Sequence, residues 1–263
     1  MKRIISTPLH HLYPYLFYCY GDNFYLENLI QILDKIKDNR TLFDSLPFCE
    51  TIESPKAQGD LWSLVKNHIG IKDLQEIGRL KTLKGKQDYL VSRIAMKDAV
   101  CSFLKKERGE NIPPHELYAT HNSFGQPVIR SSGGQQKQLD SLFISLSHKD
   151  NRGVAIVSCQ PVGIDIEKIE GRSEEFIQFA YTKKEISLLE DLDSSNVKRI
   201  EKSEALIRFW VAKESCAKKT GRGFQGKPQS FEVTGVEGDV IRVGDTFVQT
   251  TKIDEDYIVG WTL

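Results

Sequence analysis

The sequence predicts an α+β fold with two similar lobes, and three observations lead to this class. Apolar residues recur at helical spacing in several segments, which is typical of amphipathic helices. Short apolar runs bounded by turn residues lie between these segments and indicate short, mostly antiparallel strands. Because helices accompany such strands in each half of the chain, we expect two α+β lobes.

Residues 1–58 differ from the rest and are predicted to form an N-terminal helical extension of unknown role. An aromatic cluster over residues 13–25 is followed by apolar side chains at Leu26, Leu29 and Leu33, which predict an amphipathic helix. No motif that carries chemistry occurs in this segment.

Residues 59–160 are predicted to form the N-terminal lobe. Their apolar spacing predicts helices over residues 61–69 and 88–104. Short strands are expected over residues 116–120, 127–129, 142–146 and 153–159, with a hairpin turn at residues 122–125.

Residues 161–263 are predicted to form the C-terminal lobe, which repeats the coarse order without a visible sequence repeat. Helices are expected over residues 174–180, 183–191 and 203–219. Strands are expected over residues 162–166, 230–233, 239–243, 246–251 and 257–261.

Composition excludes several classes of protein. The 263 residues include 36 Lys and Arg and 36 Asp and Glu, and this zero net charge argues against nucleic-acid or anionic-membrane binding. No apolar run reaches the roughly 18 residues of a transmembrane helix, and prolines at Pro8 and Pro14 argue against a signal peptide. Five scattered cysteines without a CxxC pair are typical of a reduced, cytoplasmic protein.

Two segments carry the strongest chemical signal, VGIDIE at residues 162–167 and FWVAKESCAKK at residues 209–219. On a strand, Asp165 and Glu167 share one face, and on a helix Glu214 and Lys218 are neighbours at i, i+4. Three carboxylates near a lysine favour a hard divalent cation that holds a phosphate. Solvated acids and a surface ion pair are the alternatives.

These segments resemble the paired signatures of the 4′-phosphopantetheinyl transferases of the surfactin-synthetase-activating type. Trp210, Lys213, Glu214, Ser215 and Lys218 match the second signature position for position. GQPVI at residues 125–129 and ISLSHKD at residues 144–150 resemble two further family segments in the right order. The resemblance covers roughly residues 60–235 and implies a pseudo-twofold pair of lobes with coenzyme A between them.

The resemblance implies a metal site formed by Asp165, Glu167 and Glu214, which would bind Mg²⁺ or Mn²⁺ next to the diphosphate of coenzyme A. It places Lys218 on the α-phosphate of coenzyme A as a catalytic residue. Lys213, off the centre of the same helix face, would reach the diphosphate or the carrier from the side.

Two upstream segments would complete the diphosphate and nucleotide contacts. The resemblance implies that His148 is catalytic and donates an N–H to the diphosphate where negative charge builds, with Ser147 assisting. Gly125, Gln126 and Pro127 would line the nucleotide pocket, although Gln126 stands where many relatives have a basic residue.

Arg93 and Lys97 stand at i, i+4 on one predicted helix, where two like charges repel unless an anion lies between them. The arrangement resembles the R-x-x-x-K helix of relatives and implies a clamp on the 3′-phosphate of coenzyme A. A solvated basic patch is the alternative.

Glu185 has two interpretations that the sequence leaves open. Thr182 followed three residues later by Glu185 fits a capping box at a helix start. The same stretch resembles the family segment in which a glutamate acts as general base on the carrier serine. One residue does not easily do both in a single conformation.

The resemblance implies an enzyme that transfers the 4′-phosphopantetheine arm of coenzyme A to a serine of an acyl or peptidyl carrier protein. The pathway would be fatty acid, polyketide or nonribosomal peptide biosynthesis. One alternative is a metal-dependent nuclease or phosphohydrolase; zero net charge and the order Lys213–Glu214, rather than E-x-K, count against the nuclease. The other is a catalytically silent carrier-binding module, against which the intact acidic set counts.

Overall fold

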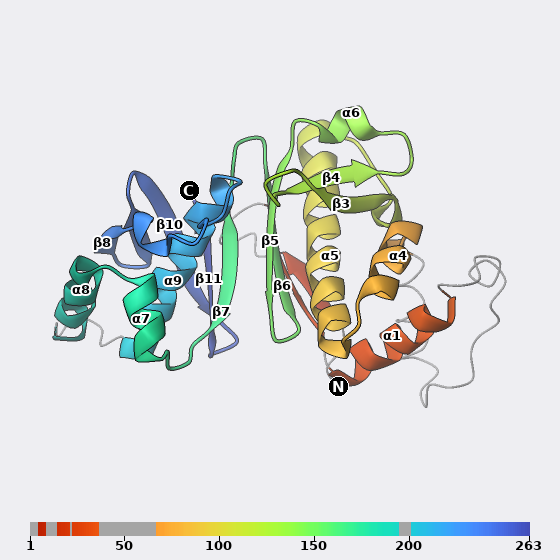
Figure 1. Cartoon of the computed structure of the whole chain (residues 1–263). Helices are drawn as coiled ribbons and strands as arrows, with labels where there is room; N and C mark the ends of the chain where they lie inside the picture. The colour runs from red at the N-terminus through yellow and green to blue at the C-terminus, as the bar shows by residue number, and fades with distance from the viewer. Residues whose placement is uncertain (1–4, 9–14, 22, 37–66, 195–200) are drawn as a thin grey trace. The chain divides into compact units, whose positions relative to one another are not determined.

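The computed structural model describes residues 5–8, 15–21, 23–36, 67–194 and 201–263 (Figure 1). The chain folds into two compact units, which are described separately below. The first comprises Met1–Thr120, Ile129–Leu142 and Asp150–Val157, and the second His121–Val128, Phe143–Lys149 and Ser158–Leu263. Both combine helices with small antiparallel sheets, so the predicted α+β class is confirmed. The boundary predicted after residue 58 lies outside the described residues.

The sheet of the first unit begins in the N-terminal segment. Strand β2 (Leu16–Tyr20) pairs antiparallel with β1 (Ile5–Pro8) on one side and with β6 (Arg152–Ser158) on the other. Leu16 and Cys19 of β2 are fully buried, because the strand lies between two others. The N-terminal segment was predicted to be a helical extension. It contains the predicted helix, but part of its aromatic-rich stretch, Leu16–Tyr20, forms a strand, as aromatic residues often do.

Helices accompany this sheet. They are α1 (Asn23–Ile36), α4 (Ile71–Arg79) and α5 (Leu83–Phe103), which continues as a π-helical turn over Leu104–Arg108. α5 contacts the sheet, and α1 and α4 contact α5. α5 packs directly on the sheet, because a Cβ at Gly153 of β6 would lie 2.5 Å from the backbone oxygen of Val91. The predicted helices at residues 26–36 and 88–104 are confirmed, α4 was not predicted, and most of residues 61–69 lies outside the described part of the chain.

A hairpin joins β3 (Leu117–His121) to β4 (Pro127–Ser131) at the predicted turn, and the short helix α6 (Gln136–Leu139) follows. The side chain of Asn122 shapes the turn, since its Oδ1 accepts hydrogen bonds from the backbone N–H groups of Phe124 and Gln126 at 2.9 and 3.0 Å. Gly125 takes a φ of 82°, which favours glycine.

The second unit contains a five-stranded antiparallel sheet in the order β7-β11-β10-β9-β8. The strands are β7 (Ile164–Lys168), β8 (Val233–Glu237), β9 (Val240–Val243), β10 (Thr246–Ile253) and β11 (Tyr257–Thr262). The predicted strand at residues 230–233 is wrong in position, because Pro228–Ser230 form a 3₁₀ turn and β8 starts later. β5 (Phe143–Lys149) contacts β7, where the N–H of Ile164 donates to Ser145 Oγ at 3.0 Å.

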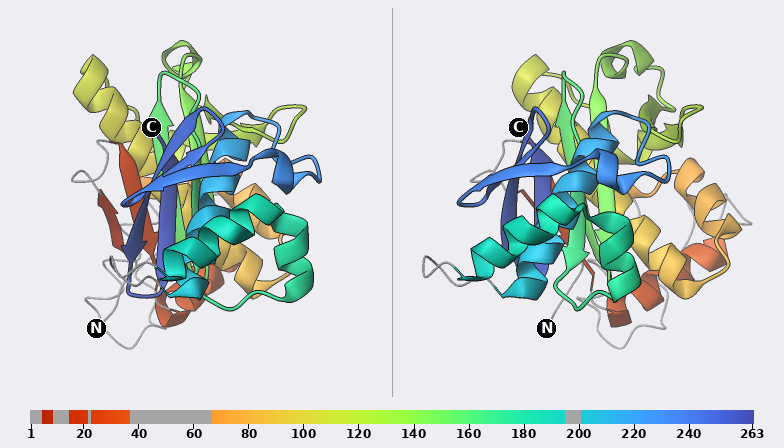
Figure 2. Two further views of the ribbon diagram at one scale, coloured as in Figure 1. Left: turned by 90° about the vertical axis from the view of Figure 1, so that its left-hand side faces the viewer. Right: turned by 60° about the vertical axis from the view of Figure 1, so that its left-hand side comes forward.

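Three helices pack with this sheet, α7 (Glu174–Ala180), α8 (Lys183–Ser194) and α9 (Lys202–Lys219), and α7 and α8 lie beside α9 (Figure 2). They share an apolar core with β8, β9 and β10. Trp210 of α9 sits in this core, 4.8 Å from the ring of Phe176 and 5.2 Å from that of Phe224. The face of α9 that begins with Leu206 and Trp210 is therefore turned inward.

Candidate active site

The two motif segments meet where β7 lies against α9. A Cβ at Gly163, just before β7, would lie 1.8 Å from the backbone oxygen of Ser215 on α9. Only glycine allows this approach. The strand that carries Asp165 is thereby held against the helix that carries Glu214.

Asp165 is the buried centre of the site, with 4% of its surface exposed. Its Oδ1 accepts hydrogen bonds from Ser147 Oγ and from Lys218 Nζ, each at 2.7 Å. Its Oδ2 is buried and has no hydrogen-bond partner among the described residues. The structure thus brings together three of the predicted site residues and leaves one carboxylate oxygen of Asp165 available.

Glu167, two residues along β7, is paired with two basic side chains. Its Oε2 lies 2.9 Å from Lys149 Nζ and 3.0 Å from a guanidinium nitrogen of Arg172. Burial lowers the pKa of Lys149, but the hydrogen bond and the charge of Glu167 outweigh burial and raise it. No local sequence pattern pointed to Lys149 or Arg172 as partners of Glu167.

Glu214 experiences the charge of both neighbouring acids. Burial, and then the negative charges of Asp165 and Glu167, raise its pKa to about 7, although Lys218 opposes the shift. Two like charges near a buried carboxyl favour its protonated form. The three predicted metal ligands therefore interact electrostatically.

Two other predicted site segments, His148 and the tip of the β3–β4 hairpin, are more exposed than Asp165. His148 lies near the end of β5, between buried Ser147 and partly buried Lys149. At the tip, Gln126 lies close to the loop after α9, because a Cβ at Gly221 would meet Gln126 Oε1 at 2.7 Å. Gly125 and Pro127 flank it at the turn and at the start of β4.

Glu185 is enclosed in the contact between α8 and α9. Its Oε2 accepts from the N–H of Thr182 at 2.7 Å while its own N–H donates to Thr182 Oγ1 at 3.2 Å, which completes a capping box. Lys213 Nζ lies 2.7 and 2.8 Å from its two oxygens, and the N–H of Val233 donates to Oε1 at 2.9 Å.

Both members of this pair are fully buried, with 0% of either side chain exposed. The structure therefore has Glu185 in the capping arrangement, with both carboxylate oxygens engaged inside the protein. It also corrects the predicted diphosphate contact of Lys213, whose ammonium group has no access to a ligand.

Lys97 and Arg93 belong to the first unit, on α5. Lys97 Nζ lies 2.5 Å from Asp73 Oδ2, and both side chains are 1% exposed. Lys97 therefore forms a buried ion pair and does not offer its ammonium group to a phosphate as predicted. Arg93 lies with its guanidinium 4.9 Å from the ring centre of Tyr89. Its Nε is buried without a hydrogen-bond partner in the described residues.

Residues 161–261 match the family described as the 4′-phosphopantetheinyl transferase superfamily. The C-terminal part of the chain is thus similar to this superfamily. The chain is 28% identical over 160 residues to the 4′-phosphopantetheinyl transferase gsp of Aneurinibacillus migulanus, and 27% identical over 184 residues to Sfp of Bacillus subtilis. It is 38% identical over 69 residues to a holo-[acyl-carrier-protein] synthase of Thermodesulfovibrio yellowstonii.

These relatives carry the names of enzymes, and each match covers only part of the two proteins compared. The gsp match spans 56% of this chain and 60% of the relative, and the Sfp match 59% and 80%. The synthase match spans 26% of this chain and 56% of the relative. The family match includes β7 and α9, and hence Asp165, Glu167, Glu214 and Lys218. Of the helices in the described residues, none is both long and apolar enough to cross a membrane.

The acidic residues of this site have the chemistry of a divalent-cation site. Carboxylate oxygens are the ligands of hard cations, and Asp165 offers a buried, unpartnered oxygen next to Glu214. Within the described ranges, no three His, Cys, Asp or Glu side chains are arranged to hold a metal ion. Glu167 is directed to Lys149 and Arg172 instead.

We expect Glu214→Gln to stabilise the protein at pH 8 and to change little at pH 4. Wild-type Glu214 has a pKa near 7 in the fold against 4.5 ordinarily. Below the lower value both states are protonated, and as pH rises the unfolded state ionises first, so the cost to stability grows until about pH 7. The variant removes this cost, on the order of 1–3 kcal/mol.

Urea denaturation in EDTA at both pH values measures this effect. Glu237→Gln, at an exposed position of β8, is the control and should change stability at neither pH. A lower stability of Glu214→Gln at pH 8 would show that the folded state favours the ionised carboxylate.

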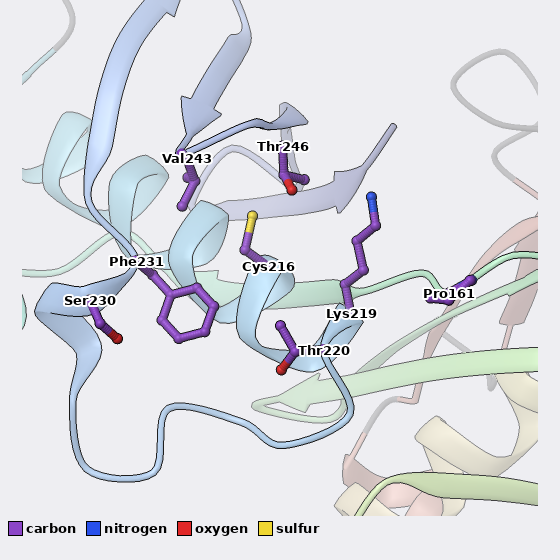
Figure 3. A pocket seen from close by; sticks show the side chains of 9 residues that line it. Pro161, Cys216, Lys219, Thr220, Ser230, Phe231, Val243 and Thr246 are labelled. Atoms are coloured by element: carbon purple, nitrogen blue, oxygen red, sulfur yellow. The ribbon is translucent and has the colours of Figure 1, made fainter.

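A pocket of about 410 Å³ lies on another face of α9 (Figure 3). α9 contributes Cys216 and Lys219 to it and its C-cap residue contributes Thr220, and Phe231 and Val243 close it from other elements. At 100° per residue, these helical positions point away from Glu214 and Lys218. Burial raises the pKa of the Cys216 thiol to about 12. The pocket is therefore separate from the acidic site.

Proposed function

We propose that this protein transfers the 4′-phosphopantetheine arm of coenzyme A to a serine hydroxyl of an acyl or peptidyl carrier protein and releases adenosine 3′,5′-bisphosphate. The observation that carries the proposal is the contact of Asp165 with Ser147 and Lys218, beside Glu214. Asp165, Glu214 and Lys218 lie inside the segment that matches the superfamily. Two residues predicted from separate motifs, Ser147 and Lys218, thus contact the carboxylate of Asp165, which comes from a third motif.

In the proposed reaction the serine oxygen forms a bond to the phosphorus that carries pantetheine. The bond from this phosphorus to the bridging diphosphate oxygen breaks, and adenosine 3′,5′-bisphosphate leaves with the electron pair. The serine proton passes to a base. Such transfers depend mostly on positioning and on neutralising charge.

The side chains of the site fit these tasks. Asp165 and Glu214, with Glu167, would hold Mg²⁺ or Mn²⁺, which supplies charge neutralisation at the diphosphate when bound. Lys218 is 27% exposed beside Asp165, so its ammonium group can meet a phosphate oxygen. His148 is exposed on β5 and would donate to the same diphosphate. Both oxygens of Glu185 are engaged in the buried ion pair with Lys213, which supports a different group as acceptor of the serine proton.

We also infer that the two units are the two similar lobes of the fold. Each unit pairs a buried acid at the third residue of a short helix with a lysine on its long helix. The pairs are Asp73 with Lys97 and Glu185 with Lys213. In both, the acid also accepts a hydrogen bond from the N-cap backbone, of Gly70 and of Thr182. This shared device supports the proposal.

A cytoplasmic location belongs to the same proposal. Cys19, Cys101, Cys159 and Cys216 are free. Free thiols are typical of reducing compartments.

The experiment that tests the function incubates the protein with coenzyme A, Mg²⁺ and an apo carrier protein. Mass spectrometry of the carrier should show an added mass of about 340 Da, the phosphopantetheine increment of a group transfer to serine. A carrier whose serine is replaced by alanine is the control. Carrier binding without added mass would identify a silent binding module, and no reaction with any apo carrier would contradict the proposal.

We expect Arg93→Ala to raise KM for coenzyme A by about tenfold, as the loss of one charge-assisted contact implies, with kcat almost unchanged. Its proposed partner is the 3′-phosphate, which takes no part in the reaction, so binding is lost equally in the ground and transition states. Steady-state kinetics with coenzyme A and dephospho-coenzyme A measure this.

The variant should discriminate less between these two substrates than the wild type. Lys105→Ala, at an exposed position of the first unit, is the control. An unchanged preference for coenzyme A in Arg93→Ala would place the 3′-phosphate contact elsewhere.

A further inference from the structure

The acidic site contains a pair of basic side chains that the proposed chemistry does not use. Lys149 and Arg172 both contact the same oxygen of Glu167, at 2.9 and 3.0 Å. The three residues come from β5, from the segment after β7 and from β7. Residues distant in the sequence therefore meet on one carboxylate.

The pair is held in place by further contacts. Arg172 places its second terminal nitrogen 2.8 Å from Glu170 and lies 5.2 Å from the ring centre of Phe176. Lys149 is also 3.7 Å from Glu170. The side chains of Lys149 and Arg172 are 27% and 18% exposed, so solvent screens their charges only in part.

The charges of this network nearly cancel. Its acids are Asp165, Glu167, Glu170 and Glu214, and its basic residues are Lys149, Arg172 and Lys218. With all groups ionised one negative charge remains, which is less than the charge of a divalent cation. Opposite charges attract over a few ångströms and like charges repel, so Lys149 and Arg172 oppose cation binding at Glu167.

We propose that Lys149 and Arg172 are positioning residues that compete with a divalent cation for Glu167 and thereby keep cation affinity low in the substrate-free protein. The inference rests on the proposed function in taking the acidic set as the cation site. In this proposal Glu167 binds either Lys149 and Arg172 or the cation, and cation binding displaces the two basic groups.

Titration of the full chain with MnCl₂ in the absence of coenzyme A tests this, with free Mn²⁺ measured by its electron paramagnetic resonance signal. We expect Lys149→Ala and Arg172→Ala each to lower the Kd for Mn²⁺ by about tenfold, because each removes a positive group that competes with the cation for the carboxylate of Glu167. Lys168→Ala is the matched control. It removes a lysine next to Glu167 whose side chain alternates to the opposite face of β7, and it should stay within about twofold of wild type.

A second set of variants tests whether the effect passes through Glu167. In a Glu167→Gln background, Lys149→Ala should give no gain in Mn²⁺ affinity, because the carboxylate in contention is gone. An unchanged or weaker affinity of both Lys149→Ala and Arg172→Ala, an equal gain in Lys168→Ala, or a gain that survives Glu167→Gln would each overturn the proposal.

The readout involves neither coenzyme A nor a carrier. Failure of the mass-shift experiment with a normal Mn²⁺ result would therefore reject the transferase and not the competition. If the mass shift is normal but the variants do not change Mn²⁺ affinity as expected, the competition at Glu167 is rejected and the transferase is retained.

Discussion

Asp165→Asn should lower the rate of phosphopantetheine transfer by about 10²–10³-fold, the usual cost of removing an electrostatic contact at a reacting centre. The substitution keeps the shape of the side chain but removes the charge that Lys218 and Ser147 contact at 2.7 Å. It also removes the buried, unpartnered oxygen offered to a cation. Carrier mass shift against time measures the rate, and circular dichroism checks that the variant is folded.

Asp239→Asn, an exposed acid paired with Arg208 in the same unit, is the control and should transfer at the wild-type rate. Excess EDTA should abolish transfer by the wild type. Full activity of Asp165→Asn, or of the wild type in EDTA, would contradict the assignment of the acidic site.

Lys213→Met should destabilise the protein by about 3–5 kcal/mol, because it leaves the fully buried carboxylate of Glu185 without its cation. Urea denaturation at pH 7.5 measures the loss. Lys219→Met, on the same helix at a partly exposed position, should change stability by less than about 0.5 kcal/mol. Removing both charges with Lys213→Met and Glu185→Gln should recover part of the loss.

Glu185→Gln alone separates the capping role from general-base catalysis. We expect a clear loss of stability, since Lys213 keeps its charge and loses its partner, while the folded variant retains kcat within a few-fold. General-base catalysis is worth about 10²–10⁴ in rate. A fall of that size at unchanged stability would restore Glu185 as the base.

Local patterns predicted the parts of the site that depend on one element. The DxE alternation of β7 and the inward face of α9 follow from strand and helix periods, and the structure has both. The capping box at Thr182 and Glu185 was also readable, because its residues are three apart. The turn at Asn122 followed from its residue types.

Features that arise from packing between elements were not predictable in this way. Lys213 matches its motif position but is buried, because α8 brings Glu185 against it. Lys97 was assigned to a phosphate for lack of any sign that Asp73 of α4 would meet it. The strands β1 and β2 were missed; they pair with each other, and the second partner of β2, β6, lies more than a hundred residues away.

The contact at Gly163 has a consequence for how this site can vary. The distance between β7 and α9 is set by two backbones in contact, with no side chain between them that could be exchanged for a larger or smaller one. A gain of even one methyl group there would separate the opposing acids without altering any of them. The backbone therefore fixes the distance between β7 and α9. Adaptation of the site to another ion or substrate has to proceed through changes in the side chains around it.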